Sequence, residues 1–362
     1  MKTNAITSQA NALSTASLAG EIRLELSHLR EKSFLLGFGL FILDAAAYGA
    51  CFVALVFLPW PWALKIPFSL ALGVIITRLF IVGHDAAHGS LTGSKAADGI
   101  LARLAFLPSL HPCSLWQVGH NRVHHSFTNL KGIDFIWMPF SPEEYRALPG
   151  WRQLAERMYR SVLGMGAYYL VEIWWKYLSV KGVSALGRSR SIYWFDVALT
   201  LAFLLAQVIG VCLLAPTARV ETVLLAVVLP FLTWNWMMGF IIYNHHTSPS
   251  VRFYNNRKQW RFYEGQIQGT VHMIFPRPFG MLLNRIMEHT AHHLDVNIPF
   301  YRLAAAQQLI EDRLGDDLIV ERWSLKSFMS TLHFCQLYDY NQQRWVTFDH
   351  ATKGRSKCLN PQ

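Results

Sequence analysis

Four long apolar stretches constrain the fold of this 362-residue chain more than any other feature of its sequence. They cover residues 34–59, 63–82, 193–215 and 221–243. Each is long enough for a helix that crosses a bilayer, which takes about 20 mostly apolar residues. The first two are joined by the short turn "WPW" and the last two by "PTAR". The sequence therefore predicts an all-α integral membrane protein whose four transmembrane helices form two hairpins.

The composition agrees with a membrane protein and argues against other classes. Only 15% of the residues are charged, whereas about a quarter are charged in a soluble domain. The five cysteines include no CxxC pair, which argues against a disulfide framework and a zinc–thiolate site. The net charge of +10 comes without an isolated basic block or a nucleic-acid recognition motif. We therefore expect anionic membrane lipid, and no nucleic acid, as a partner.

The basic residues predict the orientation in the membrane. The two tight turns and their edges contain only Lys65 and Arg219, and the other segments contain nearly all the rest. By the positive-inside rule, both termini and the long middle segment face the cytoplasm. We expect a disordered cytoplasmic tail at residues 1–20, the membrane domain at residues 21–310 and a C-terminal cytoplasmic cap at residues 311–362. Shorter apolar stretches at residues 100–110 and 161–178 are predicted to be helices in the cytoplasmic interface.

Three charged residues, Asp44, Arg78 and Asp196, lie within or at the edges of the apolar stretches. A charge inside a bilayer is costly and normally faces protein or a cavity. We expect these side chains to point into the helix bundle. Arg78 lies near the end of its helix, so reaching the interface is an alternative for this residue.

Histidines form the second distinctive feature. All fifteen except His28 lie from His84 onward, and neither outward turn contains one. The motifs "HDAAH", "HNRVHH" and "EHTAHH" contain His84, His88, His120, His124, His125, His289, His292 and His293. Residues three or four apart share one face of a helix, so His84 can pair with His88, and His120 with His124. An adjacent residue points about 100° away, so the double histidines suit two neighbouring metal ions.

These motifs predict a metal site on the cytoplasmic face, because neutral imidazole is the commonest metal ligand in proteins. A catalytic zinc takes about three protein ligands, so eight histidines imply two ions. Ligation by nitrogen alone admits zinc, copper, iron or nickel, and the spacing does not choose among them. His111, in "LHPCS", is interpreted as structural, and His245 has no histidine at helical spacing.

The motifs and their flanks resemble the membrane fatty acid desaturases. The matching segments are "GHDAAHGS", "HNRVHHSFTNLKGIDFIWMPFSPEEYRALP", "HHTSP", "GTVH" and "EHTAHHLDVNIPFYRL". They look most like bacterial and cyanobacterial acyl-lipid desaturases of the Δ12 (omega-6) type. The resemblance extends over about residues 34–310. It implies a non-haem centre of two iron ions and a location in a bacterial inner membrane.

The resemblance also implies which residues hold the iron. The eight motif histidines become ligands, and a ninth comes from a segment before the last motif. His272, in "QGTVH", is the preferred ninth ligand, and His246 is its competitor. Gln268 takes the position of an asparagine that reaches one iron through water in the acyl-CoA branch of the family. Carboxylates and amides near the motifs are candidates to orient the imidazoles: Asp85, Asn121, Asp134, Asn244, Glu288 and Asp295.

The implied activity is the O2-dependent introduction of a double bond into a fatty acyl chain, linked to a lipid, an acyl carrier protein or CoA. The chain has no nucleotide fingerprint G-x-G-x-x-G after a strand and no cytochrome b5 signature. A separate electron donor such as ferredoxin is therefore expected. Its docking site, or a site for lipid headgroups, is predicted at the basic residues Arg252, Arg257, Lys258 and Arg261.

Other functions remain open at this point. An acetylenase or a hydroxylase could use the same histidine scaffold. A transporter or metal-handling membrane protein is a distant alternative, because it would place histidines near the middle of the bilayer. Here the histidines flank the apolar stretches instead.

Overall fold

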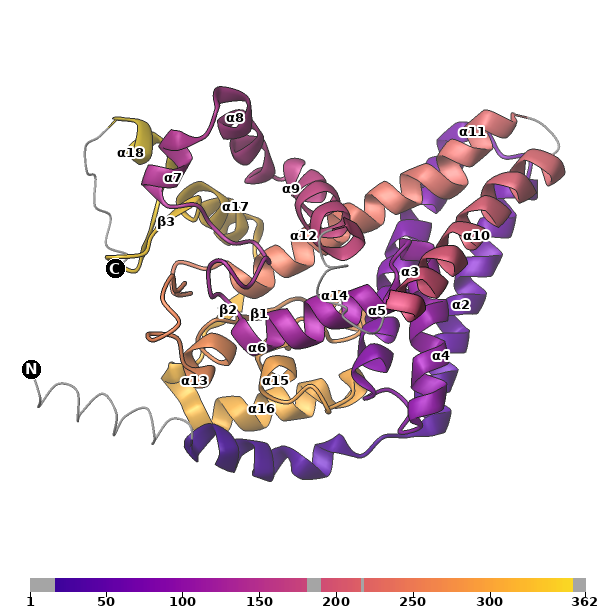
Figure 1. The fold of residues 1–362 in the computed structure, drawn as a ribbon. Coiled ribbons are helices and arrows are strands. Elements are labelled where there is room, and N and C mark those ends of the chain that lie inside the picture. Colours follow the sequence, from indigo (N-terminus) through magenta and orange to yellow (C-terminus); the bar gives the residue numbers. More distant parts are fainter. Residues whose placement is uncertain (1–16, 181–189, 216–217, 354–362) are drawn as a thin grey trace, which may run out of the picture.

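The computed structural model describes residues 17–180, 190–215 and 218–353. Helices dominate it, with the long helices gathered on one side and shorter helices and strands on the other (Figure 1). The segments long and apolar enough to cross a membrane are α2 (Phe34–Phe57), α3 (Trp62–His88), α10 (Arg190–Leu214) and the run Arg219–His246. That run consists of α11 (Arg219–Val223), the π-helical turn η6 (Leu224–Val228) and α12 (Leu229–His246). The prediction of a helical membrane protein with four such segments is confirmed.

Helix α3 is longer than the predicted span at residues 63–82. It continues through the first histidine motif and ends at Gly89, whose φ of 72° suits a residue without a side chain. Its 27 residues correspond to about 40 Å, which exceeds the hydrocarbon thickness of about 30 Å. The last turns, with His84 and His88, can therefore project from the apolar layer while remaining part of one rigid helix.

Helices α3 and α12 form the inside of the bundle, and α2 and α10 form its outside. Within the most apolar 18 residues of each helix, only 22% of the residues of α2 and 11% of those of α10 are buried, against 56% of those of α3. Exposed apolar side chains such as Leu35 and Leu213 cover the outer helices. At the inner contact a Cβ on Gly73 would lie 2.5 Å from the Cβ of Thr233, so only glycine permits this approach. The outer surfaces are suited to lipid.

The charged residues of the apolar segments are paired inside the protein. Arg78 Nε donates to Asp44 at 2.8 Å, and Arg78 Nη1 donates to two carbonyl groups at the end of α14 (Arg277–Leu282). Asp196 accepts from Arg103 at 2.7 Å. The expectation that these side chains point into the bundle is confirmed, and Arg78 does not take the alternative route to the interface.

Short elements between α3 and α10 carry the middle histidine motif. They are α4 (Lys95–Phe106), η2 (Leu107–Ser109), α5 (Cys113–Gln117), η3 (Val118–His124), α6 (His125–Phe127), α7 (Pro142–Ala147), α8 (Gly150–Tyr159), α9 (Gly164–Tyr168) and η4 (Tyr169–Val180). The apolar stretch at residues 100–110 lies in α4 and η2, which contact α3. The stretch at 161–178 lies in α9 and the π-helix η4, which contact α12.

The C-terminal third adds short helices and two small sheets. The helical elements are α13 (Phe262–Gln266), α14, α15 (His289–Leu294), η7 (Phe300–Arg302), α16 (Leu303–Leu314), η8 (Gly315–Asp317), α17 (Leu325–Phe334) and α18 (Phe348–Lys353). Strand β1 (His272–Ile274) pairs in parallel with β2 (Val320–Arg322), and β3 (Leu337–Asp339) pairs antiparallel with β4 (Arg344–Val346). Strand β1 lies in the predicted membrane domain (residues 21–310) and β2 in the predicted C-terminal cap (residues 311–362), so this pair connects the two parts.

The prediction of a disordered tail at residues 1–20 is wrong for residues 17–20, which are helical. Residues 1–16 lie outside the described residues, whereas residues 17–25 are helical. Ala19 and Ile22 of this helix are buried in the main core with Leu26 of η1 (Leu26–Arg30). Apolar residues at this spacing lie on one helix face, which explains why residues 17–20 belong to a helix that packs on the core. At the other end of the chain, residues 354–362 of the predicted cap also lie outside the described residues.

Candidate metal centre

Nine histidines form two groups that could each hold a metal ion. Within each group, one nitrogen from every ring lies within 4.8 Å of the others. The first cluster consists of His84, His88, His120, His125 and His292. The second cluster consists of His124, His246, His289 and His293. All eight motif histidines that were predicted as ligands are present, and they come from α3, η3, α6 and α15.

A π-helical turn divides the middle motif between the clusters. In η3 the backbone N–H of His125 donates to the carbonyl of His120, which is the i→i+5 bond of a π-helix. This wider turn directs His120 and His125 toward the first cluster and leaves His124 in the second. The prediction that His120 and His124 share one centre was therefore wrong, because it assumed α-helical spacing.

Both double histidines are split between the two clusters. His124 and His293 belong to the second cluster, while their neighbours His125 and His292 belong to the first. In α15 the i, i+4 pair His289 and His293 stays together, as helical spacing predicts. The interpretation that adjacent histidines serve two neighbouring sites agrees with this arrangement.

The ninth histidine is His246, not His272. His246 is the last residue of α12, and its Nε2 lies 3.0 Å from Nε2 of His289. His272 lies in β1, where its Nδ1 contacts the carboxylate of Glu311, and it belongs to neither cluster. The structure therefore brings His246, and not the preferred His272, to the clusters. A usable signal was present in the sequence, because His246 closes the fourth apolar stretch much as His88 closes the helix of the second.

The imidazoles of the first cluster face one another through their Nε2 atoms. The Nε2 atom of His120 is 3.0 Å from that of His84 and 3.0 Å from that of His125, and the Nε2 atom of His292 is 3.1 Å from that of His125. Burial, followed by the charge of neighbouring imidazoles, holds the pKa of His120, His125 and His292 well below the ordinary value. The rings are therefore neutral and carry lone pairs available to a cation.

Unpartnered nitrogen atoms give an independent test of whether metal fits. Nε2 of His88 and Nε2 of His293 are buried and have no hydrogen-bond partner among the described residues. Leaving such atoms unpaired is costly, and a bound metal ion would pair them. Four or five imidazole nitrogens form a suitable donor set for a first-row transition metal. The residues present therefore fit two metal ions.

Two aspartates fix the orientation of ligand rings. Asp85 accepts from Nδ1 of His84 at 2.9 Å, and its other oxygen accepts from the backbone N–H of Phe300. Asp134 contacts Nδ1 of His124 at 3.1 Å. A carboxylate at Nδ1 places the proton there and directs the Nε2 lone pair toward the cluster. The proposed orienting role of both residues agrees with these contacts.

Gln266, which sequence reasoning missed, connects the clusters. Its Nε2 donates to the carbonyl of His125 at 2.6 Å, and its Oε1 accepts from Nδ1 of His293 at 2.7 Å. Gln268, predicted for a similar place, instead lines a polar surface groove with Arg252. Gln268 was predicted because it lies four residues before His272, and His272 lies outside the clusters.

The remaining candidates bind elsewhere. The two amides donate to backbone carbonyls: Asn121 to that of Ala87 and Asn244 to that of Phe240. The two carboxylates form ion pairs: Glu288 with Arg285 and Asp295 with Arg30. No hydrogen bond between these four side chains and a cluster histidine occurs in the described part of the chain. Their proximity in sequence to the motifs did not bring them to the ligands.

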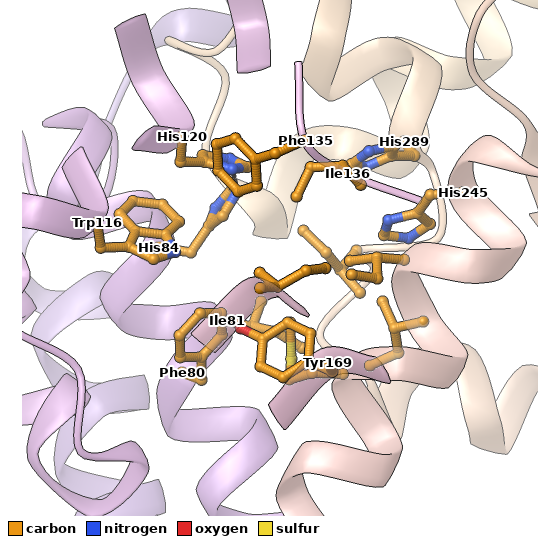
Figure 2. A pocket seen from close by; sticks show the side chains of 15 residues that line it. Phe80, Ile81, His84, Trp116, His120, Phe135, Ile136, Tyr169, His245 and His289 are labelled. Atoms are coloured by element: carbon orange, nitrogen blue, oxygen red, sulfur yellow. Dashed lines mark hydrogen bonds between the residues drawn. The ribbon is translucent and has the colours of Figure 1, made fainter. Parts of the chain in front are cut away.

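A narrow apolar cavity of about 50 Å³ reaches both clusters. Figure 2 shows His84, His120, His245 and His289 along one side, with Phe80, Ile81 and Tyr169 at the opposite end. His245 stacks on His289 with 3.6 Å between ring centroids, outside both clusters. Because Phe80 and Ile81 precede His84 in α3, the cavity extends from the histidines toward the apolar part of the bundle.

Comparison with known proteins identifies the family. Residues 59–324 match the family model described as fatty acid desaturase. The chain is 29% identical over 319 residues to the sn-1 oleoyl-lipid 12-desaturase of Picosynechococcus sp., covering 86% of this chain and 87% of that protein. It is 30% identical to the enzyme of the same name from Anabaena variabilis, covering 77% and 78%. It is 28% identical to the chloroplastic omega-6 fatty acid desaturase of Spinacia oleracea, covering 83% of this chain and 65% of that protein. The chain therefore belongs to the fatty acid desaturase family, whose enzymes desaturate fatty acids.

Proposed function

We propose that this protein is a Δ12 (omega-6) desaturase that places a second double bond in a lipid-linked monounsaturated acyl chain. The proposal rests on one observation: a single apolar cavity is lined by histidines of both clusters. The names of the relatives support the position of the double bond and the oleoyl-lipid substrate. They also favour desaturation over the hydroxylase and acetylenase alternatives.

The clusters would hold two iron ions, which would supply the oxidising power to take hydrogen from an unactivated methylene. For each double bond, O2, two electrons and two protons combine with the two hydrogens of the acyl chain to give two waters. The chain's own residues orient the substrate and the ligands. The apolar cavity walls hold the acyl chain beside His84, His120 and His289 and exclude water. Asp85 and Asp134 keep the ligand rings in one tautomer.

The proposed arrangement has both termini and all histidine motifs on the cytoplasmic side of a bacterial inner membrane. The four long helices form two hairpins, with the stretches at residues 100–110 and 161–178 as helices in the interface and the C-terminal residues as a cap. The short link between α2 and α3 and the exposed apolar faces of α2 and α10 support this arrangement. So does the scarcity of basic residues in the outward turns.

The electrons would come from a separate acidic carrier such as ferredoxin. The proposed docking surface is the exposed basic segment with Arg252, Arg257, Lys258 and Arg261. The guanidinium of Arg257 lies 4.8 Å from the ring centre of Trp260. The indole N–H of Trp260 donates to the carbonyl of Thr128, whose hydroxyl donates to the carbonyl of His124. These contacts connect the segment to His124 of the second cluster, a residue that does not line the cavity.

Lipid analysis by gas chromatography and mass spectrometry tests the proposed function. The wild type and His124→Ala would be expressed, with a ferredoxin system, in a bacterium that makes only saturated and monounsaturated fatty acids. A new Δ9,Δ12 diene is expected from the wild type and from the control His333→Ala, which changes an exposed histidine of α17. It should be absent with His124→Ala. A hydroxy or acetylenic product, or no product from protein that contains two irons and receives electrons, would overturn the proposal.

A further inference from the structure

A groove of about 350 Å³ lies at the end of the long helices that is opposite to the histidine clusters. Its walls are the end of α2, the link from α2 to α3, the first turn of α3 and the start of α11. Figure 1 shows α11 at the end of the bundle far from α15. Lys65 lines the groove 23 residues before His88 in α3, which corresponds to about 35 Å of helix. Since the hydrocarbon layer is about 30 Å thick, the groove and the clusters belong to opposite surfaces of the membrane.

Lys65 is the unusual residue of this groove. Its neighbours Ala63, Leu64 and Pro67 are exposed, whereas only 7% of the surface of Lys65 is accessible. Within the described part of the chain, the ammonium group of Lys65 has no hydrogen-bond acceptor and no ion-pair partner. An unpaired charge in such a place is costly. An anion bound in the groove would pair this charge.

The surroundings of the groove are those of a lipid headgroup. Trp60 and Trp62 line it, and Trp62 is 64% exposed. Indole rings gather at the level of the headgroups in membrane proteins. Toward the middle of α2, the exposed side chains of Val53 and Phe57 continue an apolar surface on which acyl chains can lie. The anion best placed to reach Lys65 is therefore the phosphate of a phospholipid.

A carboxylate in the same groove narrows the choice of headgroup. Glu221, in the first turn of α11, lines the groove and is exposed. Among the described residues it forms no ion pair with Lys65 or with another cation. A headgroup that joins a phosphate to a primary ammonium group presents an opposite charge to each of these two side chains. The ethanolamine headgroup does so, whereas choline has no N–H to donate and glycerol has no positive charge.

We propose that this groove binds the headgroup of phosphatidylethanolamine, with the phosphate at Lys65 and the ammonium group at Glu221. The site is separate from the metal clusters and from the apolar cavity, and the inference does not depend on the proposed function. A small core that includes Leu72, Val211 and Ala226 packs the two pairs of long helices together near this end. Because the lipid would contact the α2–α3 link and α11 at once, it would stabilise that packing.

The test measures lipid binding to the purified full-length protein. Delipidated protein in detergent is titrated with phosphatidylethanolamine, phosphatidylcholine or phosphatidylglycerol of identical acyl chains, and the bound lipid is counted by native mass spectrometry. We expect phosphatidylethanolamine to bind most tightly. Lys65→Met should weaken its binding by about tenfold, as for the loss of one charge-assisted hydrogen bond. Lys65→Arg should retain it. The control Arg219→Gln removes an exposed positive charge at the same end, outside the groove lining, and should bind as the wild type does.

The melting temperature of the protein in detergent gives a second readout, because a ligand that binds only the folded state raises it. Phosphatidylethanolamine should raise the melting temperature of the wild type more than that of Lys65→Met. Glu221→Gln should lose the preference for ethanolamine over choline. This variant keeps Lys65 in place, so it tests the inference even if Lys65→Met does not fold.

Three results would overturn the inference. They are equal binding of phosphatidylethanolamine by the wild type and Lys65→Met, tighter binding of phosphatidylglycerol than of phosphatidylethanolamine, and equal stabilisation by inorganic phosphate alone. Each of them would leave the proposed function intact, since that function is tested by the acyl products.

Discussion

The Nε2 atoms of His246 and His289 lie 3.0 Å apart, where the end of α12 meets the start of α15. Since His246 is one of four nitrogen donors in the second cluster, we predict that His246→Ala lowers the iron content from two per chain toward one and abolishes desaturation. Iron would be measured by mass spectrometry on purified protein. His272→Ala is the matched comparison and should keep both irons. The reverse result would restore His272 as the ninth ligand.

Gln266 provides a prediction about metal retention. Its side chain contacts His125 and His293, which belong to different clusters. Removing a group that orients a metal ligand typically lowers metal affinity by about 10- to 100-fold. Gln266→Ala should therefore lose iron to a chelator at lower concentration than the wild type. Gln268→Ala, which changes the groove residue, should behave as wild type; equal chelator sensitivity of the two variants would contradict the assignment.

The ion pair between Asp44 and Arg78 leads to a stability prediction. Asp44 is buried, and Arg78 is mostly so. Breaking a buried pair from one side leaves an uncompensated charge and costs about 3 kcal/mol or more. Asp44→Asn should lower the melting temperature of the detergent-solubilised protein. The double variant Asp44→Leu with Arg78→Met should recover much of the loss, since it removes both charges. A double variant less stable than Asp44→Asn would show that the carbonyl contacts of Arg78 matter more than its charge pair.

The basic segment beside Trp260 predicts how reduction depends on salt. Reversing the charge of Arg257, Lys258 and Arg261 should raise the KM for reduced ferredoxin by about tenfold or more and weaken the dependence of the rate on ionic strength. Reduction of the iron by dithionite, followed by absorbance, should be unchanged. Lys326→Glu, at an exposed residue of α17, is the charge control.

If these reversals alter binding to anionic vesicles and leave the KM for ferredoxin unchanged, the segment binds lipid headgroups instead. Replacing Trp260 by leucine tests the connection itself. That variant should bind ferredoxin normally and accept electrons more slowly, because the indole contact with Thr128 is lost.

The sequence predicted the features that depend on length, hydropathy and local spacing. The four spans were found because no soluble helix needs so many consecutive apolar residues. The division of each double histidine between two sites follows from the angle between adjacent helical residues. Asp85 was found because it is adjacent to its partner His84. These inferences need only the backbone geometry of one segment.

The features that the sequence did not predict depend on contacts between segments. The π turn at His120 has no composition that distinguishes it from an α-helix, so the partner of His124 was misassigned. His272 was preferred to His246 from its position before the last motif, but the parallel pairing of β1 with the distant β2 holds His272 outside the clusters. Gln266 reaches His293 only because α13 packs beside α15. No local pattern contains that information.

Helix α15 supplies histidines to both clusters, and this implies an order of events during biosynthesis. A nascent chain that stops before α15 has four of the five histidines of the first cluster and only two of the four of the second. The full set of four histidines of the second cluster is therefore assembled only after the last motif has been synthesised and has packed against the earlier elements. Assembly of the complete second cluster would thus follow the insertion of α12, and a metal ion bound there would report that α12 and α15 have reached their final places.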